Sequence, residues 1–260
     1  MFNKRLSPLR YPGGKSKLTE YIYNHLNHTK TKNFVSPYTG GGSVEFSLLE
    51  AGIISHLHIN DKDYGLYALY LIIFNAPYLL IDLIRYKEIT HMDFFYAQEQ
   101  IKKDYQGLDL IDAAWSLLLV NRLAYSGIYK ANPLGGKNGN IDSLLSGWNR
   151  EGLIKLIEYL YTFKDSITLT NEDACDLIEE MYWDESSTIF IDPSYVNKGK
   201  ALYHYYYERE DHLKLNHVLD TLFHGFPGAD VLITYDKNKS LELYTCIRKL
   251  KQLDVYILFN

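Results

Sequence analysis

Residues 34–44 read FVSPYTGGGSV, an apolar run that leads into three glycines and then into a helical pattern. Between a strand and a helix, such a turn lets the backbone approach a ligand closely, and the start of the helix offers free N–H groups. The dinucleotide-binding fingerprint G-x-G-x-x-G does not fit, because Glu45 stands where its third glycine belongs. The turn therefore predicts a ligand site of another class, or else a flexible loop that binds nothing.

Strand-like runs bounded by glycine, proline, aspartate or asparagine recur along the chain, and helical patterns separate many of them. This alternation predicts an α/β fold with a mostly parallel sheet. The predicted strands cover residues 34–38, 56–61, 167–173, 187–192, 229–236 and 253–259. The predicted helices between them cover residues 16–26, 44–51, 176–182 and 211–223.

Residues 64–166, between the second and third predicted strands, show mainly helical periodicity. A loop rich in glycine and asparagine, residues 130–148, interrupts it. We therefore predict an α/β domain made of residues 1–63 and 167–260, into which a helical domain of residues 64–166 is inserted. The helical patterns of the insertion cover residues 66–73, 92–105, 109–124 and 152–163.

Residues 64–84 are apolar and long enough to suggest a membrane span. Asn75 and Pro77 lie near the middle of the segment and Asp82 near its end, and each would be unfavourable in a helix that faces lipid. The segment therefore predicts a buried helix that is broken or kinked at Pro77, and no membrane partner.

Composition excludes several classes of protein. The chain has 260 residues, of which 47% are hydrophobic, and a net charge of -5, so it is neither disordered nor strongly basic. Two cysteines are too few for a disulfide scaffold, and the polar start of the chain predicts no secretory leader, so we expect a cytoplasmic protein. The 24 tyrosines serve either an ordinary core or a surface that stacks on planar ligands such as bases.

Two further motifs flank the glycine turn. Residues 10–16, RYPGGKS, lack the glycine that a P-loop needs at position 9, but they present Tyr11 and Lys15 near the start of a helix. Lys15 faces either an anionic group or solvent. Asp61 ends the second predicted strand, where folds of this class hold a ribose hydroxyl.

Residues 190–195 read FIDPSY, in which an apolar strand delivers an acid, a proline turn and an aromatic ring. The Asp192 carboxylate and the Pro193 carbonyl can accept hydrogen bonds from one amine, and Tyr195 can stack on a flat ring. The motif predicts a socket for an amino-substituted heterocycle. The alternative is an ordinary Asp-Pro turn after a strand.

Taken together and in this order, the four motifs resemble the Dam-like DNA adenine-N6 methyltransferases, the alpha group of enzymes that depend on S-adenosylmethionine. The resemblance runs from residue 9 to about residue 236, and residues 121–130 resemble the family's loop that enters DNA. It implies a Rossmann-like methyltransferase sheet, a helical target-recognition domain at residues 64–166, double-stranded DNA as the partner, a monomeric protein and no metal. The adenine would be flipped out of the duplex, and its exocyclic amine would be held by Asp192 and Pro193.

The resemblance also assigns a role to individual residues. It implies cofactor contacts for Tyr11, Lys15, Gly40, Gly42, Asp61, Asp173 and Ala174. It implies catalytic roles for Asp192, Pro193 and Tyr195, and DNA contacts for Arg122, Tyr125, Ser126 and Lys130.

Two positions depart from the family pattern. Ser36 stands where the family has an acid that helps to hold the ammonium group of the cofactor, and Ser194 stands where it has a second proline. These departures leave open a DNA-binding homologue with weakened or lost catalysis. A separate alternative keeps the chemistry but moves it to the amino group of cytosine. Arg122, in turn, either contacts DNA or pairs with a buried carboxylate.

Overall fold

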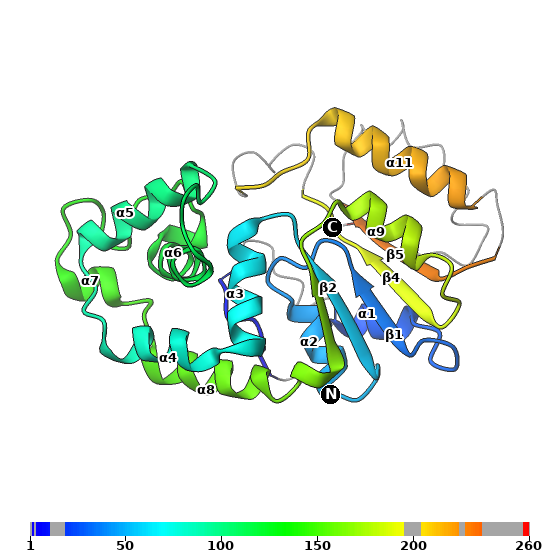
Figure 1. Cartoon of the computed structure of the whole chain (residues 1–260), viewed down its shortest axis with the longest axis horizontal. Coiled ribbons are helices and arrows are strands. Elements are labelled where there is room, and N and C mark those ends of the chain that lie inside the picture. Colours follow the sequence, from blue (N-terminus) through cyan, green and yellow to red (C-terminus); the bar gives the residue numbers. More distant parts are fainter. Residues whose placement is uncertain are drawn as a thin grey trace.

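The computed structural model describes residues 2, 4–10, 19–194, 204–223, 227–235 and 257–259. Within these ranges six strands form one sheet in the order β3-β2-β1-β4-β5-β6, and every pairing is parallel (Figure 1). This arrangement confirms the predicted Rossmann-like α/β class. The strands are β1 (Asn33–Ser36), β2 (His56–Asn60), β3 (Ile167–Thr170), β4 (Ser187–Ile191), β5 (Asp230–Tyr235) and β6 (Ile257–Phe259).

Helices cover both faces of the sheet, because side chains along each strand point alternately to opposite faces. Phe34 of β1 and Phe190 of β4 pack in one apolar cluster with residues of α1 (Thr19–His25) and α2 (Ser43–Glu50). Their strand neighbours Val35 and Ile189 pack in a second cluster with α9 (Ala174–Met181) and α11 (Arg209–Phe223). The sheet is thus the middle layer of three.

The chain between β2 and β3 is helical, and in Figure 1 its helices extend to one side of the sheet. The apolar cluster that covers the α1 and α2 face continues into these helices through Leu69, Leu118 and Ile157. Helix α3 packs on α6 and α8, and α4 packs on α8. The elements are α3 (Tyr64–Asn75), α4 (Pro77–Tyr86), α5 (His91–Lys102), α6 (Leu110–Leu123), η2 (Tyr125–Gly127), α7 (Ile141–Leu145), α8 (Arg150–Tyr161) and η3 (Lys164–Ser166).

The predicted break at Pro77 is confirmed. Helix α3 ends at Asn75 and α4 begins at Pro77, and the two helices meet at a bend of 103°. Proline is tolerated in the first turn of a helix but not inside one, because it has no N–H to donate. No single helix in the described ranges is long and apolar enough to cross a membrane, and this bent pair alone passes that test, by length and composition.

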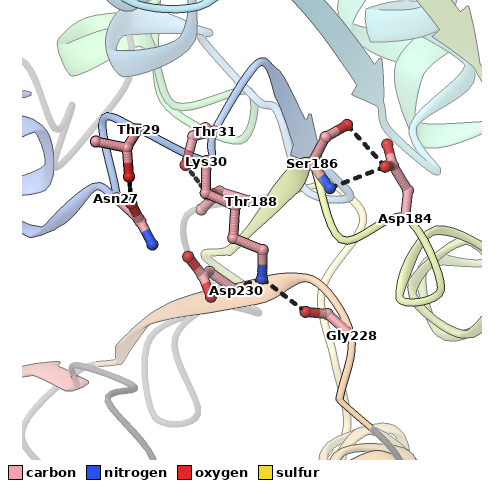
Figure 2. Close-up of polar contacts among 9 residues, drawn as sticks. All are labelled: Asn27, Thr29, Lys30, Thr31, Asp184, Ser186, Thr188, Gly228 and Asp230. Atoms are coloured by element: carbon pink, nitrogen blue, oxygen red, sulfur yellow. Dashed lines mark hydrogen bonds and ion pairs between the residues drawn. The ribbon is translucent and has the colours of Figure 1, made fainter.

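Polar contacts tie the amino-terminal ends of three strands together, as Figure 2 shows. Lys30 Nζ donates to the Gly228 carbonyl at 3.0 Å and lies 3.4 Å from Asp230 Oδ1 at the start of β5. The hydroxyls of Thr31, just before β1, and Thr188 of β4 are 2.7 Å apart. These contacts fix the amino-terminal ends of the strands. The loops that carry the predicted site leave the sheet at the opposite, carboxyl-terminal ends.

Candidate active site

Asn60, the last residue of β2, joins the carboxyl ends of three neighbouring strands. Its side chain is buried and donates to the carbonyls of Pro37, after β1, and Glu172, after β3, at 3.0 and 3.2 Å. Its Oδ1 accepts the Thr170 hydroxyl and the Glu172 N–H, both at 2.9 Å. Because both ends of the buried amide are bonded, the loops after β1, β2 and β3 are held side by side.

A cavity of about 390 Å³ opens at this edge of the sheet. Open α/β sheets bind their ligands at the carboxyl ends of the strands. The cavity brings the glycine turn and the Asp-Pro turn together, although they lie about 150 residues apart in the chain. The predicted residues that line it are Gly40, Gly42, Asp61, Asp173, Ala174, Asp192 and Pro193. Three predicted residues lie outside the described ranges: Tyr11, Lys15 and Tyr195.

The glycine turn is held from two sides. The Gly40 N–H donates to Asp61 Oδ2 at 2.8 Å, and the Gly40 carbonyl accepts the buried hydroxyl of Tyr70 at 2.9 Å. Gly40 and Gly42 have φ values of 52° and 64°, the left-handed region that glycine enters without strain. The turn is therefore an ordered part of the cavity wall, and Gly42 leads directly into α2.

We expect Gly42→Ala to lower the free energy of unfolding by about 1–3 kcal/mol, because alanine is strained at a positive φ. A Cβ there would also overlap Cε2 of the buried Phe46 ring. The matched control is Gly52→Ala, at φ +67° with nothing within 4 Å of the new Cβ, which adds the strain without the clash. Urea unfolding of both variants measures the difference. Equal losses of unfolding free energy in the two variants would show that the Phe46 ring moves away from the new Cβ at no cost in stability.

Asp61 joins the loop after β2 to the glycine turn. Its Oδ1 accepts the Asp63 N–H at 3.0 Å, while its Oδ2 holds Gly40. Burial, together with the negative charge of Asp63, raises the pKa of Asp61 to about 7. Each carboxylate oxygen can accept a second hydrogen bond from a ligand in the cavity. Asp61 is thus a ready acceptor for a ligand hydroxyl, and its protonation changes near neutral pH.

Asp192 follows β4 and is oriented by the neighbouring strand. Thr234 of β5 donates its hydroxyl to Asp192 Oδ1, and Thr234 itself is buried. Ser194, two residues on, accepts the Tyr207 N–H at 2.7 Å, and the Tyr207 hydroxyl accepts the hydroxyl of Tyr38 at 2.7 Å. The serine that replaces the family's proline therefore ties the segment around Tyr207 to the cavity wall, a contact that proline cannot make.

Asp173 and Ala174 line the cavity at the start of α9. Asp173 is the N-cap of that helix, because its Oδ1 accepts the Cys175 N–H at 3.0 Å. The same oxygen accepts Lys214 Nζ from α11 at 3.0 Å. Hydrogen bonds to these two donors outweigh partial burial and lower the pKa of Asp173. Its carboxylate is therefore charged at neutral pH and is held at the cavity edge by two helices.

The four residues predicted to contact DNA lie together on a segment at the end of α6, outside the cavity lining. Tyr125 is 68% exposed, Ser126 is exposed with φ 56°, and Lys130 Nζ lies 5.0 Å from the centre of the Tyr129 ring. Arg122 is half-buried, and burial with the nearby charge of Arg10 lowers its pKa. Within the described ranges Arg122 forms no ion pair, so the predicted carboxylate partner is not found there.

His204 connects this segment to the cavity. It lines the cavity, and its ring contacts the Tyr129 ring with centroids 5.3 Å apart. Its Nε2 lies 3.2 Å from Asp104 Oδ1, just after α5. The exposed segment that carries Tyr125 therefore adjoins one side of the cavity mouth.

Residues 11–253 match the model of the D12 class N6 adenine-specific DNA methyltransferases. The chain belongs to this family. It is 22% identical over 212 residues to the Type II methyltransferase M.MjaIII of Methanocaldococcus jannaschii, covering 74% of this chain and 70% of the relative. It is 24% identical over 222 residues to the Type II methyltransferase M.CviBI of Paramecium bursaria Chlorella virus NC1A, covering 82% of this chain and 78% of the relative.

The family match confirms the predicted class of enzyme: this methyltransferase uses a methyl donor and methylates adenine in DNA. The adenine specificity of the family is evidence against the cytosine alternative. The roles of single residues remain proposals. In the described part of the methyltransferase, no group of three or more His, Cys, Asp or Glu side chains is placed to hold a metal ion.

Two residues of this methyltransferase were missed by the sequence reasoning. Thr234 was considered only as part of a strand, and Glu45 only as the residue that breaks the dinucleotide fingerprint. The structure places Glu45 in the cavity lining, buried, with the Ser36 hydroxyl donating to its Oε1 at 2.8 Å. An acid in the first turn of an apolar helix was the only available signal.

Proposed function

We propose that this methyltransferase transfers a methyl group from S-adenosylmethionine to the exocyclic amine of an adenine that is flipped out of double-stranded DNA. The observation that supports it is the single cavity shared by the glycine turn and the Asp192-Pro193 turn. One cavity lets the methyl donor and the acceptor amine meet in the geometry of attack.

The residues along the cavity suit S-adenosylmethionine. The strand order β3-β2-β1-β4 sets Asp173, Asp61, the glycine turn and Asp192 in that order along the sheet edge. Asp173 and Ala174 would lie beside the adenine of the cofactor, Asp61 would accept its ribose hydroxyls, and the turn would admit its methionine part. When bound, this cofactor supplies a methyl group activated by the positive charge on sulfur.

Asp192 and Pro193 would prepare the amine of the target adenine. The lone pair of this amine is delocalised into the ring, which makes it a poor nucleophile. Asp192 and the Pro193 carbonyl would each accept a hydrogen bond from one of its N–H groups, favour a pyramidal nitrogen and free the lone pair for in-line attack. The N–C bond would form as the bond from the methyl carbon to sulfur breaks, and one N–H proton would then be lost from the methylated amine. Thr234, by fixing Asp192 Oδ1, would hold the carboxylate in place for this contact. Tyr195, outside the described ranges, keeps its proposed role of stacking on the base.

The target adenine must leave the duplex to reach the cavity, at a cost of a few kcal/mol. Tyr125 is exposed on the segment whose Tyr129 contacts His204 of the cavity lining, and it would fill the gap left by the base. Arg122, Ser126 and Lys130 on the same segment would contact phosphates or base edges. In this proposal residues 64–166 form the target-recognition domain. Both relatives are Type II methyltransferases, which supports methylation at a specific site, as in restriction–modification.

Purified protein incubated with labelled S-adenosylmethionine and double-stranded DNA tests this proposal. Digestion of the product to nucleosides should give N6-methyladenine as the labelled species. Mapping the modified positions then identifies the recognition sequence. Label in N4-methylcytosine, or none in DNA, would contradict the proposal.

Tyr125→Ala is expected to reduce base flipping by roughly 10-fold, since stacking of a base on an aromatic ring contributes about 1–3 kcal/mol. The measurement is the fluorescence of 2-aminopurine placed at the mapped adenine. Trp183→Ala is the control, because Trp183 is 59% exposed but lies near the amino-terminal end of β4, away from the cavity. An unchanged fluorescence rise in the Tyr125 variant would exclude a wedge at this position.

A further inference from the structure

Glu45 is a buried acid in the wall of the cavity. It lies in the first turn of α2, is 3% exposed, and accepts the hydroxyl of Ser36, the last residue of β1, at 2.8 Å. Ser36 is fully buried and cannot itself supply a charge. The carboxylate of Glu45 is therefore held at the end of β1, although it comes from the helix that follows the strand.

The protein itself gives this carboxylate no counter-ion within the described ranges, where no Lys, Arg or His pairs with Glu45. Burial raises its pKa to about 7, and the negative charge of Asp192 adds to the rise. A buried acid beside a second acid destabilises the folded chain unless a positive charge joins them. A cation that enters the cavity would remove this penalty.

The position of Glu45 selects which part of the cofactor it meets. Along the sheet edge, β1 lies between β2, which carries Asp61, and β4, which carries Asp192. In the proposed cofactor the sulfur carries three groups: the ribose, the transferred methyl and the methionine chain with its ammonium group. With the ribose at Asp61 and the methyl directed toward Asp192, the methionine chain would lie at the glycine turn that follows β1. The end of β1, where the Glu45 carboxylate is held, would therefore be beside the ammonium group.

We propose that Glu45 is the counter-ion of the methionine ammonium group of S-adenosylmethionine, and that Ser36 positions its carboxylate for that contact. This inference rests on the cofactor proposed above. The acid that the sequence lacks at position 36 is thus supplied from α2. An ammonium group donates charge-assisted hydrogen bonds, which suit a carboxylate. A sulfonium has no N–H to donate, and a carboxylate held in line with it would itself accept the methyl group.

The test is calorimetric titration of the wild-type protein and of Glu45→Gln with three probes. S-adenosylmethionine carries both the ammonium and the sulfonium, S-adenosylhomocysteine carries the ammonium alone, and 5′-methylthioadenosine carries neither. The glutamine keeps an oxygen for the Ser36 hydroxyl but removes the charge. We expect the variant to bind the first two probes more weakly by a similar factor, roughly 10- to 100-fold, and the third unchanged.

Two further variants sharpen the result. Ser36→Ala should weaken the same two probes by a smaller factor, roughly 3- to 10-fold, because it frees the carboxylate without removing it. Glu50→Gln removes a charge from the same helix at a residue that pairs with Lys4 outside the cavity lining, and should change no affinity. Thermal unfolding at pH 8 should show Glu45→Gln at least as stable as the wild type, since it removes a buried charge.

Three results would overturn the inference while leaving the proposed cofactor in place. They are unchanged binding of S-adenosylmethionine by Glu45→Gln, a loss confined to S-adenosylmethionine, which would place Glu45 against the sulfonium, and an equal loss for all three probes. A wild-type protein that binds none of the probes would overturn the proposed cofactor and this inference with it.

Discussion

Asp192→Ala is expected to slow methyl transfer by at least about 100- to 1,000-fold, the range typical of removing one group that assists proton movement in the transition state. The alanine cannot accept the hydrogen of the adenine amine, whose lone pair then stays delocalised in the ring. It also leaves the buried Thr234 hydroxyl without its acceptor. The measurement is single-turnover methylation at saturating DNA and cofactor, where binding no longer limits the rate.

Two further variants test the charge of the Asp192 carboxylate and its position separately. Asp192→Asn keeps an oxygen that can accept from the amine, so the loss should be smaller than with alanine. Thr234→Val removes the hydroxyl that holds Asp192 Oδ1 and should lower the single-turnover rate while cofactor affinity stays unchanged. Full activity of Asp192→Ala, in protein shown to be folded, would exclude Asp192 from the mechanism. The Pro193 carbonyl would then be the one proposed acceptor left for the adenine amine.

Asp61→Ala is expected to weaken cofactor binding by roughly 10- to 100-fold, since it removes an acceptor for ligand hydroxyls in a buried site. The substitution also frees the Gly40 N–H, so the glycine turn loses one of its two anchors. Calorimetric titration with S-adenosylhomocysteine measures the affinity without turnover. A variant that binds this probe as tightly as the wild type would show that the ribose lies elsewhere.

The pH dependence of cofactor binding follows from the same residue. The pKa of Asp61 is raised to about 7, chiefly by burial, so the free protein holds a proton there below pH 7. A ligand that donates to the carboxylate favours its charged form, so binding releases the proton. Affinity should therefore rise as the pH increases from 6 to 8 and level off above that. Glu45, whose pKa is also about 7, contributes in the same direction. Weaker binding at pH 8 than at pH 6 would contradict this.

The order of strands and helices could be predicted from the sequence, because apolar alternation and turn residues act locally. All six predicted strands are present in the described ranges, although most end earlier than predicted. Residues 171–173 were assigned to a strand, but Asn171 and Asp173 leave the ladder to bond the Asp61 carbonyl and to cap α9. Helix α7 was missed inside the predicted loop, because a helix of five residues has too little periodicity to detect.

The cavity residues with the clearest local signals were also found from the sequence. Gly40 and Gly42 need backbone conformations that few other residues adopt, and Asp192 stands in a compact motif of acid, proline and aromatic ring. The two serines that depart from the family pattern had no local explanation. Their partners, Glu45 and Tyr207, lie nine and thirteen residues away along the chain, and no spacing rule joins them.

The amino-acid order is enough to place most strands and helices, the bend of the glycine turn and the acids at strand ends. It does not show which of these ends share a cavity, or that the carboxylate at the end of β1 comes from Glu45; folding establishes both. The difference lies in the range of the interactions. Backbone preference and apolar periodicity depend on neighbours along the chain, whereas burial, hydrogen-bond partners and shifted pKa values depend on segments that meet only after the sheet has formed.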